Sequence, residues 1–218
     1  MLEEFFSKLK QGLSIDSFLR EINTAQEKID ELRKSNSLQH NNQSLKKYHD
    51  EVVPVKRYIC KMDIDSRSTI KFNLNNQYPD CILLGSQKPI SIEVTQVRAR
   101  ENNYLLRQMR DQKHAPGFLG VSEEAPEIEF CKAKRRKNHS YSTQNVIETI
   151  EEDLKLRVNK KRHHEGDVLL IETNLTPLPH DTWTAYIQNF RNILISLKFK
   201  SIYITGPSEG GESCIKIK

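Results

Sequence analysis

Two acidic residues at a spacing typical of neighbouring strands are the feature of this chain best suited to chemistry. Asp80 precedes a short apolar run and Glu93 lies inside a second one, with twelve residues between the two acids. Residues 85–89 have the composition of a turn, so the two runs are expected to form adjacent strands. Side chains alternate along a strand, so Glu93 and Thr95 share one face. If Asp80 projects over that face, the two carboxylates form an oxygen pair suited to Mg²⁺ or Mn²⁺.

A metal ion held by these acids would suit the hydrolysis of a phosphate ester. It would polarise the phosphate and lower the pKa of a bound water, which supplies a nucleophile without a dedicated side-chain base. The elements that must position the acids are the two strands and a helix-like segment over 98–113, whose apolar face carries Tyr104, Leu105 and Met109. The expected order of elements is therefore strand, turn, strand and helix.

This order, together with Pro79, Asp80 and Glu93, resembles the PD-(D/E)XK nuclease superfamily. The signature of that family is Pro-Asp at one strand, a variable hairpin, and then Asp or Glu, any residue and Lys on the next strand. The resemblance implies a restriction endonuclease-like α/β fold, with a mixed central β-sheet flanked by helices. It also implies an endonuclease or other phosphodiesterase of nucleic acids that depends on Mg²⁺ (or Mn²⁺), with DNA as the substrate.

The resemblance further implies which residues would hold the metal. The ligands would be the carboxylates of Asp80 and Glu93 and the backbone carbonyl of Val94. In the resembled fold, a helix before the first core strand often supplies another acid near the metal. The candidate for that acid is Glu51, with Glu27 and Glu31 as alternatives if the longer N-terminal helix plays that part.

Thr95 departs from the resembled pattern, because it stands at the catalytic position where the family usually has lysine. That lysine is taken to orient the attacking water and to stabilise charge that builds on the transition state, and threonine carries no charge. The possible replacements are Gln96, although it should point to the opposite face, and Arg107 or Gln108 on the helix that follows.

Basic residues gather in two clusters of a chain whose formal net charge is +5. Such clusters are typical of proteins that follow a nucleic-acid backbone, whereas a solvated charged face is the alternative interpretation. The first cluster consists of Lys132, Lys134, Arg135, Arg136 and Lys137. The second consists of Lys155, Arg157, Lys160, Lys161 and Arg162.

The composition indicates a water-soluble protein with one sizeable core. The chain has 218 residues, of which 36% are hydrophobic and 29% are charged. No apolar run approaches the length of a membrane span. The first residues include Glu3 and Glu4 where a secretory signal would be basic, so a cytoplasmic location is expected.

The first 35 residues are expected to form two amphipathic helices separated near Gly12. This N-terminal helical hairpin would pack on the core, on a second copy of the chain or on a partner protein. A stretch rich in Asn, Gln and Ser over 35–44 is the expected boundary between this hairpin and the rest of the chain. The predicted division is therefore a hairpin with its linker over 1–43 and a nuclease-like core over 44–218.

The remaining elements are predicted from hydrophobic periodicity. Residues 44–51 are expected to form a short helix, residues 143–164 a long one, and a further helix carries Trp183. Strands are expected over 52–62, 68–74, 167–173 and 201–205, with a turn over 206–211.

Three functional hypotheses follow from these observations. The leading one is a metal-dependent nuclease. The second is a catalytically inactive nuclease-fold protein that binds nucleic acid or another protein, with Thr95 as the mark of lost chemistry. The third is a cytoplasmic interaction protein in which the basic clusters serve solubility.

Overall fold

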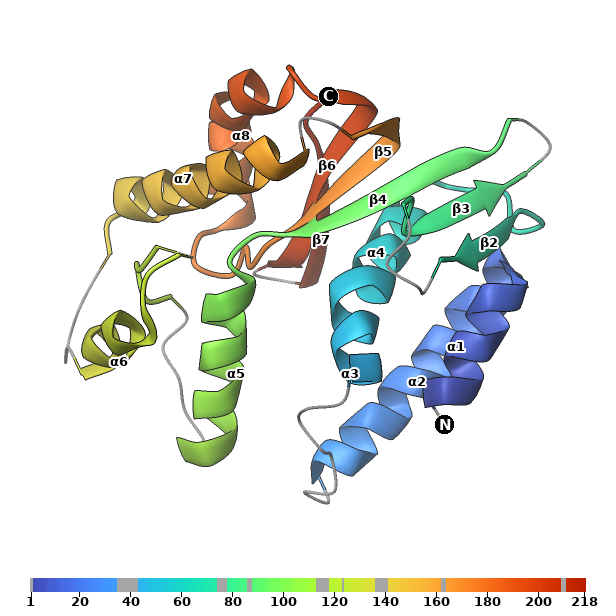
Figure 1. The fold of residues 1–218 in the computed structure, drawn as a ribbon, viewed down its shortest axis with the longest axis horizontal. Helices are drawn as coiled ribbons and strands as arrows, with labels where there is room; N and C mark the ends of the chain where they lie inside the picture. Colours follow the sequence, from blue (N-terminus) through green and yellow to red (C-terminus); the bar gives the residue numbers. More distant parts are fainter. Residues whose placement is uncertain are drawn as a thin grey trace. The chain divides into compact units, whose positions relative to one another are not determined.

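The computed structural model describes residues 2–34, 43–73, 78–85, 88–112, 118–122, 124–135, 141–161, 164–208 and 211–218. These residues form eight α-helices and a mixed seven-stranded sheet of order β1-β2-β3-β4-β5-β6-β7 (Figure 1). The strands are β1 (Leu13–Ser14), β2 (Thr69–Phe72), β3 (Cys81–Leu84), β4 (Ile90–Gln96), β5 (Glu165–Glu172), β6 (Lys198–Ser208) and β7 (Gly211–Lys216). The helices are α1 (Leu2–Gln11), α2 (Ile15–Lys34), α3 (Gln43–Lys47), α4 (Val53–Lys61), α5 (Ala99–Gln112), α6 (Glu127–Arg135), α7 (Thr143–Lys161) and α8 (His180–Leu194). The predicted α/β class with a mixed sheet is confirmed at this level.

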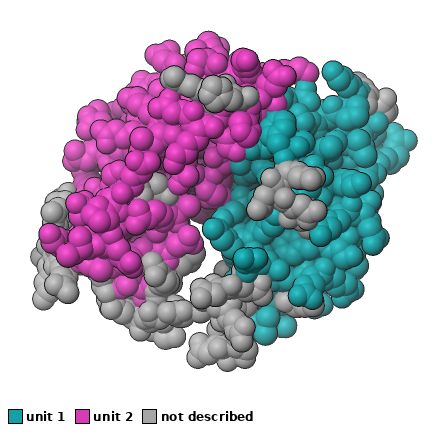
Figure 2. Space-filling view, viewed as in Figure 1, with its two compact units in different colours: residues 1–94, 166–170 teal, residues 95–165, 171–218 magenta. Residues whose placement is uncertain are grey.

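The chain divides into two compact units, which Figure 2 shows in teal and magenta. The first unit contains Met1–Val94 and Gly166–Leu170, and the second contains Thr95–Glu165 and Ile171–Lys218. Residues 35–42, where the sequence predicts most of a polar linker, lie outside the described residues. Within the described part, no helix combines the length and the apolar character needed to cross a membrane.

Antiparallel pairing of β1 to β4 organises the first unit. β2 pairs with β3 through Phe72 and Cys81, and β3 pairs with β4 through Cys81 and Ile92. Extending the second register by one residue brings Asp80 level with Glu93. The pairing of these two strands therefore places the two acids opposite each other.

Helices α1 and α2 contact β2 and bury the apolar stripes that the sequence predicts (Figure 1). The rings of Phe18 on α2 and Phe72 on β2 stack with centroids 5.9 Å apart. Between α1 and β1, Gly12 has a φ of +100°, a conformation that glycine adopts without strain. The apolar residues of α1 that are buried against the rest of the chain are Leu2, Phe5, Phe6 and Leu9.

The strand predicted over 52–62 is wrong, because this segment is helix α4. Its buried residues Val55, Tyr58 and Ile59 fall at helical spacing, so the periodicity of burial outweighs the β-propensity of Val and Ile. Pro54 lies in the first turn of α4, directly after a π-helical turn, and as a proline it has no backbone N–H to donate there. The predicted helix over 44–51 is present as α3 followed by a π-helical turn, Tyr48–Val52.

In the second unit, β6 and β7 form a long antiparallel hairpin that pairs Tyr203 with Lys216. The turn predicted over 206–211 coincides with the closed end of this hairpin, although the strands reach further into the range than expected: β6 extends to Ser208, which pairs with Gly211 at the start of β7. A Cβ on Gly206 would lie only 1.7 Å from the carbonyl oxygen of Thr173, so the close approach of these backbones requires glycine. Trp183, on the predicted helix that is now α8, is a core residue with 1% exposure.

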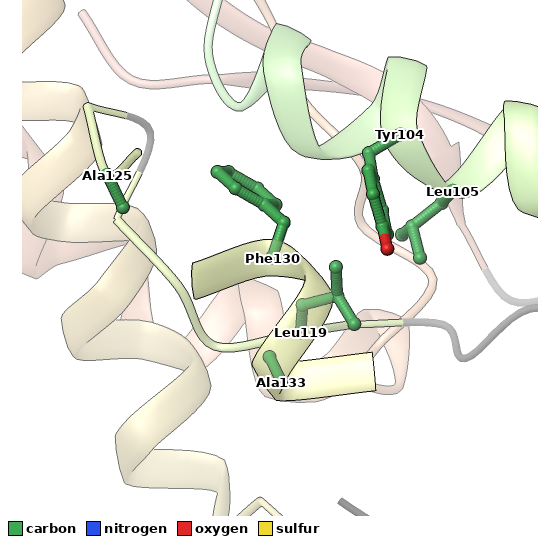
Figure 3. Close-up of a cluster of buried hydrophobic side chains, with 6 residues drawn as sticks. All are labelled: Tyr104, Leu105, Leu119, Ala125, Phe130 and Ala133. Carbon is green, nitrogen blue, oxygen red and sulfur yellow. The ribbon is translucent and has the colours of Figure 1, made fainter. Parts of the chain in front are cut away.

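A small apolar cluster joins α5 to α6 through the segment between them (Figure 3). Tyr104 on α5 and Phe130 on α6 have ring centroids 5.7 Å apart. Leu119, from the connecting segment, lies between the two helices in this view. The cluster is made of Tyr104, Leu105, Leu119, Ala125, Phe130 and Ala133.

A buried ion cluster joins α5 to α7. The guanidinium of Arg98, at the entry to α5, pairs with Glu101 and with Asp153 of α7. All three side chains are at most 3% exposed. Arg98 also lies over the ring of Phe118, 4.7 Å from its centroid, and donates a hydrogen bond to the carbonyl of Val121. These contacts hold the connecting segment and both helices together.

Candidate active site

Asp80 is held by hydrogen bonds to both neighbouring strands. Its backbone carbonyl accepts a hydrogen bond from the backbone N–H of Asn73, just after β2, at 2.8 Å. Its side-chain Oδ2 accepts one from the backbone N–H of Val94 on β4, at 2.7 Å. A hydrogen bond to an ionised carboxylate is stronger than a neutral one. The carboxylate of Asp80 is therefore fixed at β4, next to the position of Glu93.

Glu93 is an acid in an apolar stretch of strand. It is 5% exposed, and its neighbours Ile92 and Val94 are buried as well. Burial of a carboxylate is unfavourable unless other groups compensate its charge. A buried acid level with a second acid brings carboxylate oxygens together, and oxygen donors of this kind suit a divalent cation.

The π-helical turn Tyr48–Val52 positions a third acid, Glu51. The hydroxyl of Tyr48 donates to the carbonyl of Ile22 on α2 at 3.2 Å, and its ring packs edge-on against Phe5 with centroids 6.0 Å apart. Single π-helical turns inside helices are frequent at functional sites. This turn is anchored to the N-terminal helices, three residues before Glu51.

The carboxylate of Glu51 is largely withdrawn from water, with 20% of its side chain exposed. Its Oε1 lies 3.7 Å from Nζ of Lys47, and its Oε2 is buried without a hydrogen-bond partner among the described residues. Burial raises the pKa of Glu51 to about 7, and the negative charge of Asp80 contributes to the rise. The two acids thus interact, although they come from different elements. The alternatives Glu27 and Glu31 are both exposed on α2.

Cys81 provides a second indication that the acids lie together. This thiol is fully buried, and burial is the main cause that raises its pKa well above the ordinary value. The negative charges that raise the pKa further are those of Asp80, Glu51 and Glu93. All three acids therefore lie close enough to one thiol to act on it electrostatically.

Hard oxygen donors and an unpartnered buried carboxylate oxygen fit a divalent cation such as Mg²⁺. Within the described ranges, no group of three or more His, Cys, Asp and Glu side chains is arranged as a ready metal-binding cluster. The fit therefore rests on the donor chemistry of Asp80, Glu93 and Glu51 and on the unsatisfied Oε2 of Glu51.

Thr95, at the lysine position, and the possible replacements for that lysine all belong to the second unit. Thr95 and Gln96 are half-buried at the end of β4, and Gln108 is half-buried on α5. Arg107 lies on α5, and its side chain is outside the described part. The first unit brings together Asp80, Glu93, Val94 and Glu51.

Lys47 is the cation that the sequence interpretation missed. It lies one helical turn before Glu51 and pairs with it, and 17% of its side chain is exposed. The available signal was the spacing of four residues between a lysine and an acid on one helix, which brings their side chains together. A half-buried ammonium group therefore lies beside the acids of the candidate site.

The predicted nucleic-acid-binding residues are distributed over α6 and α7. Lys132 is exposed on α6, Lys160 is exposed on α7, and Lys161 is half-buried on α7. Lys134 and Arg135 belong to α6, but their side chains are outside the described part. Arg136, Lys137 and Arg162 lie outside the described residues altogether. The second unit brings Lys160 together with Arg100 and Arg157 around one cavity.

Comparison with known proteins adds no relative to this description. No protein-family model, no curated protein and no solved structure matches the chain. Its function is therefore inferred from the residues of the site and from the contacts that position them.

Proposed function

We propose that this chain is a metal-dependent nuclease that cleaves phosphodiester bonds in DNA. The observation that carries the proposal is the hydrogen bond from the Val94 N–H to Asp80 Oδ2, which fixes one acid at the strand of a second, Glu93. The buried, unpartnered Oε2 of Glu51 supports it, because a cation would satisfy that atom. The resemblance of Pro79, Asp80 and Glu93 to the PD-(D/E)XK signature supplies the reaction and the substrate.

The residues that would hold Mg²⁺ (or Mn²⁺) are Asp80, Glu93 and Glu51, with the backbone carbonyl of Val94. When bound, such an ion polarises a phosphate and lowers the pKa of a coordinated water. The contribution of the chain itself is to hold the metal ligands in position. Asp80 is held by the N–H of Val94, and Glu51 is held by a turn that Tyr48 anchors to α2.

Lys47 would supply the positive charge that Thr95 lacks. Its ammonium group lies 3.7 Å from Glu51 Oε1 and is partly withdrawn from solvent, so its interaction with a phosphate oxygen would be less screened than that of a fully exposed lysine. An ammonium group beside the metal ligands can stabilise negative charge that develops during cleavage. In this proposal, a lysine on α3 supplies the positive charge that the resembled family usually takes from a lysine on the strand corresponding to β4.

The direct test is cleavage of plasmid DNA, single-stranded DNA and RNA by the full chain, with Mg²⁺, with Mn²⁺ and with EDTA. We expect metal-dependent DNA cleavage that falls at least about 100-fold in Asp80→Asn. Glu31→Gln is the matched control, because Glu31 is an exposed acid of the same unit, and it should cleave like wild type. Unchanged cleavage in Asp80→Asn would rule the proposal out.

Two observations favour a second candidate, a nuclease-fold protein that binds nucleic acid or another protein without cutting. Thr95 stands in the lysine position, and the described residues contain no ready cluster of three metal-binding side chains. Purified protein that shifts the mobility of DNA but never cleaves it with either metal would support this alternative.

A further inference from the structure

The second unit contains an open cavity of about 300 Å³ that is lined mainly by cations. Its lining residues are Arg100, Glu124, Leu156, Arg157 and Lys160. Three of these five side chains are positively charged and one is negative. A volume of this size is at the lower end of small-ligand sites, which is enough for a phosphate group with part of a nucleotide.

One side of α7 and the first turn of α5 build the walls. Leu156, Arg157 and Lys160 follow one another at helical spacing, whereas Leu154 and Val158 are buried on the other side of α7. The guanidinium of Arg100 lies over the ring of Phe130, 5.6 Å from its centroid. Phe130 is 2% exposed in the apolar cluster of Figure 3, so Arg100 rests on a packed support.

The buried ion cluster keeps these walls together. Arg98 lies two residues before Arg100, and its partner Asp153 lies one helical turn before Arg157. The pair between Arg98 and Asp153 therefore ties together the two helix segments that carry the arginines of the cavity. Their approach is set by the fold before any ligand binds, which lowers the ordering cost of binding.

Among the five lining residues, Glu124 is the anion, and it pairs with Lys160. Glu124 Oε1 lies 3.7 Å from Nζ of Lys160, but both side chains are largely exposed, at 59% and 63%. An exposed pair of this kind is weak, so an external anion can replace Glu124 as the partner of Lys160. Arginine guanidinium groups match the geometry of phosphate oxygens, and lysine adds a point charge.

We propose that this cavity binds a phosphate group of a nucleic-acid strand, with Arg100, Arg157 and Lys160 as its ligands and Glu124 as an internal competitor. The choice of nucleic acid as the source of the phosphate rests on the proposed function. The proposal selects Arg157 and Lys160 from the second basic cluster and adds Arg100. It assigns no role to Lys155, whose Nζ pairs with Glu151 at 2.7 Å on the same helix.

The test measures binding of a fluorescent single-stranded DNA to the full chain in EDTA, so that cleavage does not interfere. We expect Arg157→Gln and Lys160→Gln to weaken binding several-fold, and each to lower the slope of log affinity against log salt by about 1. The matched control, Lys155→Gln, removes the same charge from α7 outside the cavity and should stay close to wild type. Arg157→Lys keeps the charge and serves as a second variant if Arg157→Gln folds poorly.

Glu124, the acid proposed to compete with a bound phosphate, allows a test in which DNA affinity should rise instead of fall. Glu124→Gln should tighten DNA binding, because it removes the anion beside Lys160. Glu151→Gln adds the same net charge beside Lys155 and should tighten it less. Millimolar inorganic phosphate or adenosine monophosphate should displace DNA from wild type more effectively than from Arg157→Gln, which assigns the effect to the phosphate group.

Equal DNA affinity in Arg157→Gln, Lys160→Gln and Lys155→Gln would overturn the phosphate site. Cleavage by the same proteins separates this outcome from failure of the proposed function. Binding that depends on the cavity, without any cleavage that depends on Asp80, would retain the phosphate site and reject the nuclease. Cleavage that depends on Asp80, with equal binding in the three variants, would retain the nuclease and reject the phosphate site.

Discussion

At the level of single residues, the partial burial of Glu51 beside Asp80 links protonation to stability. In metal-free protein, the pKa of Glu51 rises from its ordinary value of 4.5 to about 7. The folded state therefore holds this proton more tightly than the unfolded state does. The free energy of unfolding should fall as the pH rises from about 4.5 to about 7, because the ionised form is disfavoured only in the folded chain.

Glu51→Gln removes this pH-dependent term. We expect the variant to exceed wild type in unfolding free energy at pH 8 by on the order of 2 kcal/mol, and to lose the advantage at pH 4. Urea denaturation in EDTA at the two pH values measures it. Glu31→Gln, at an exposed position of α2, should show no such pH dependence. A difference of equal size at both pH values would contradict the role of ionisation.

Lys47 allows a second prediction at this level. Lys47→Gln should lower DNA cleavage by about 10-fold to 100-fold, because it removes the ammonium group beside the acids. Lys46→Gln is the matched control, since Lys46 is the adjacent exposed lysine on α3. Single-turnover cleavage rates, together with DNA affinity in EDTA, would show whether the loss lies in the reaction. Equal rates for the two variants would reject Lys47 as the replacement for the missing lysine.

At the level of elements, the second unit depends on the buried pair between Arg98 and Asp153. Asp153→Asn leaves Arg98 buried with one charged partner fewer and should lower the free energy of unfolding by about 3–5 kcal/mol. Glu152→Gln changes the neighbouring exposed acid of α7 and should have little effect. Chemical denaturation at pH 7 measures both. A loss below about 1 kcal/mol in Asp153→Asn would show that the pair does not hold α5 to α7.

Helices and strands differ in how well local sequence predicted them. The stripe of Leu2, Phe5, Phe6 and Leu9 identified α1 because one helix turn returns every third or fourth residue to the same face. The segment 52–62 is predicted as a strand because its Val and Ile residues favour strands locally, yet it is mostly helix α4. The segment is helical because this conformation buries Val55, Tyr58 and Ile59 against the rest of the chain.

At the level of the whole molecule, metal binding should be visible as stability. If Asp80, Glu93 and Glu51 hold a divalent ion only in the folded chain, saturating Mn²⁺ or Mg²⁺ should stabilise wild type by about 1–3 kcal/mol over EDTA. Thermal unfolding with and without metal would detect this as a rise in Tm that Asp80→Asn loses and Glu31→Gln keeps. Equal Tm shifts in all three proteins would mean that the metal binds elsewhere.

Local sequence patterns identify the two acids, the strands on or beside which they lie, and the main helices. Asp80 and Glu93 and the apolar runs beside them follow local periodicity, which a single segment contains. Packing in the folded chain, in contrast, sets which distant residues meet. It brought Glu51 to the strand acids through Tyr48 and α2, joined Arg98 to Asp153 across 55 residues, and gathered Arg100 with Arg157 and Lys160. These contacts depend on how buried surfaces pack, so no pattern within one segment predicts them.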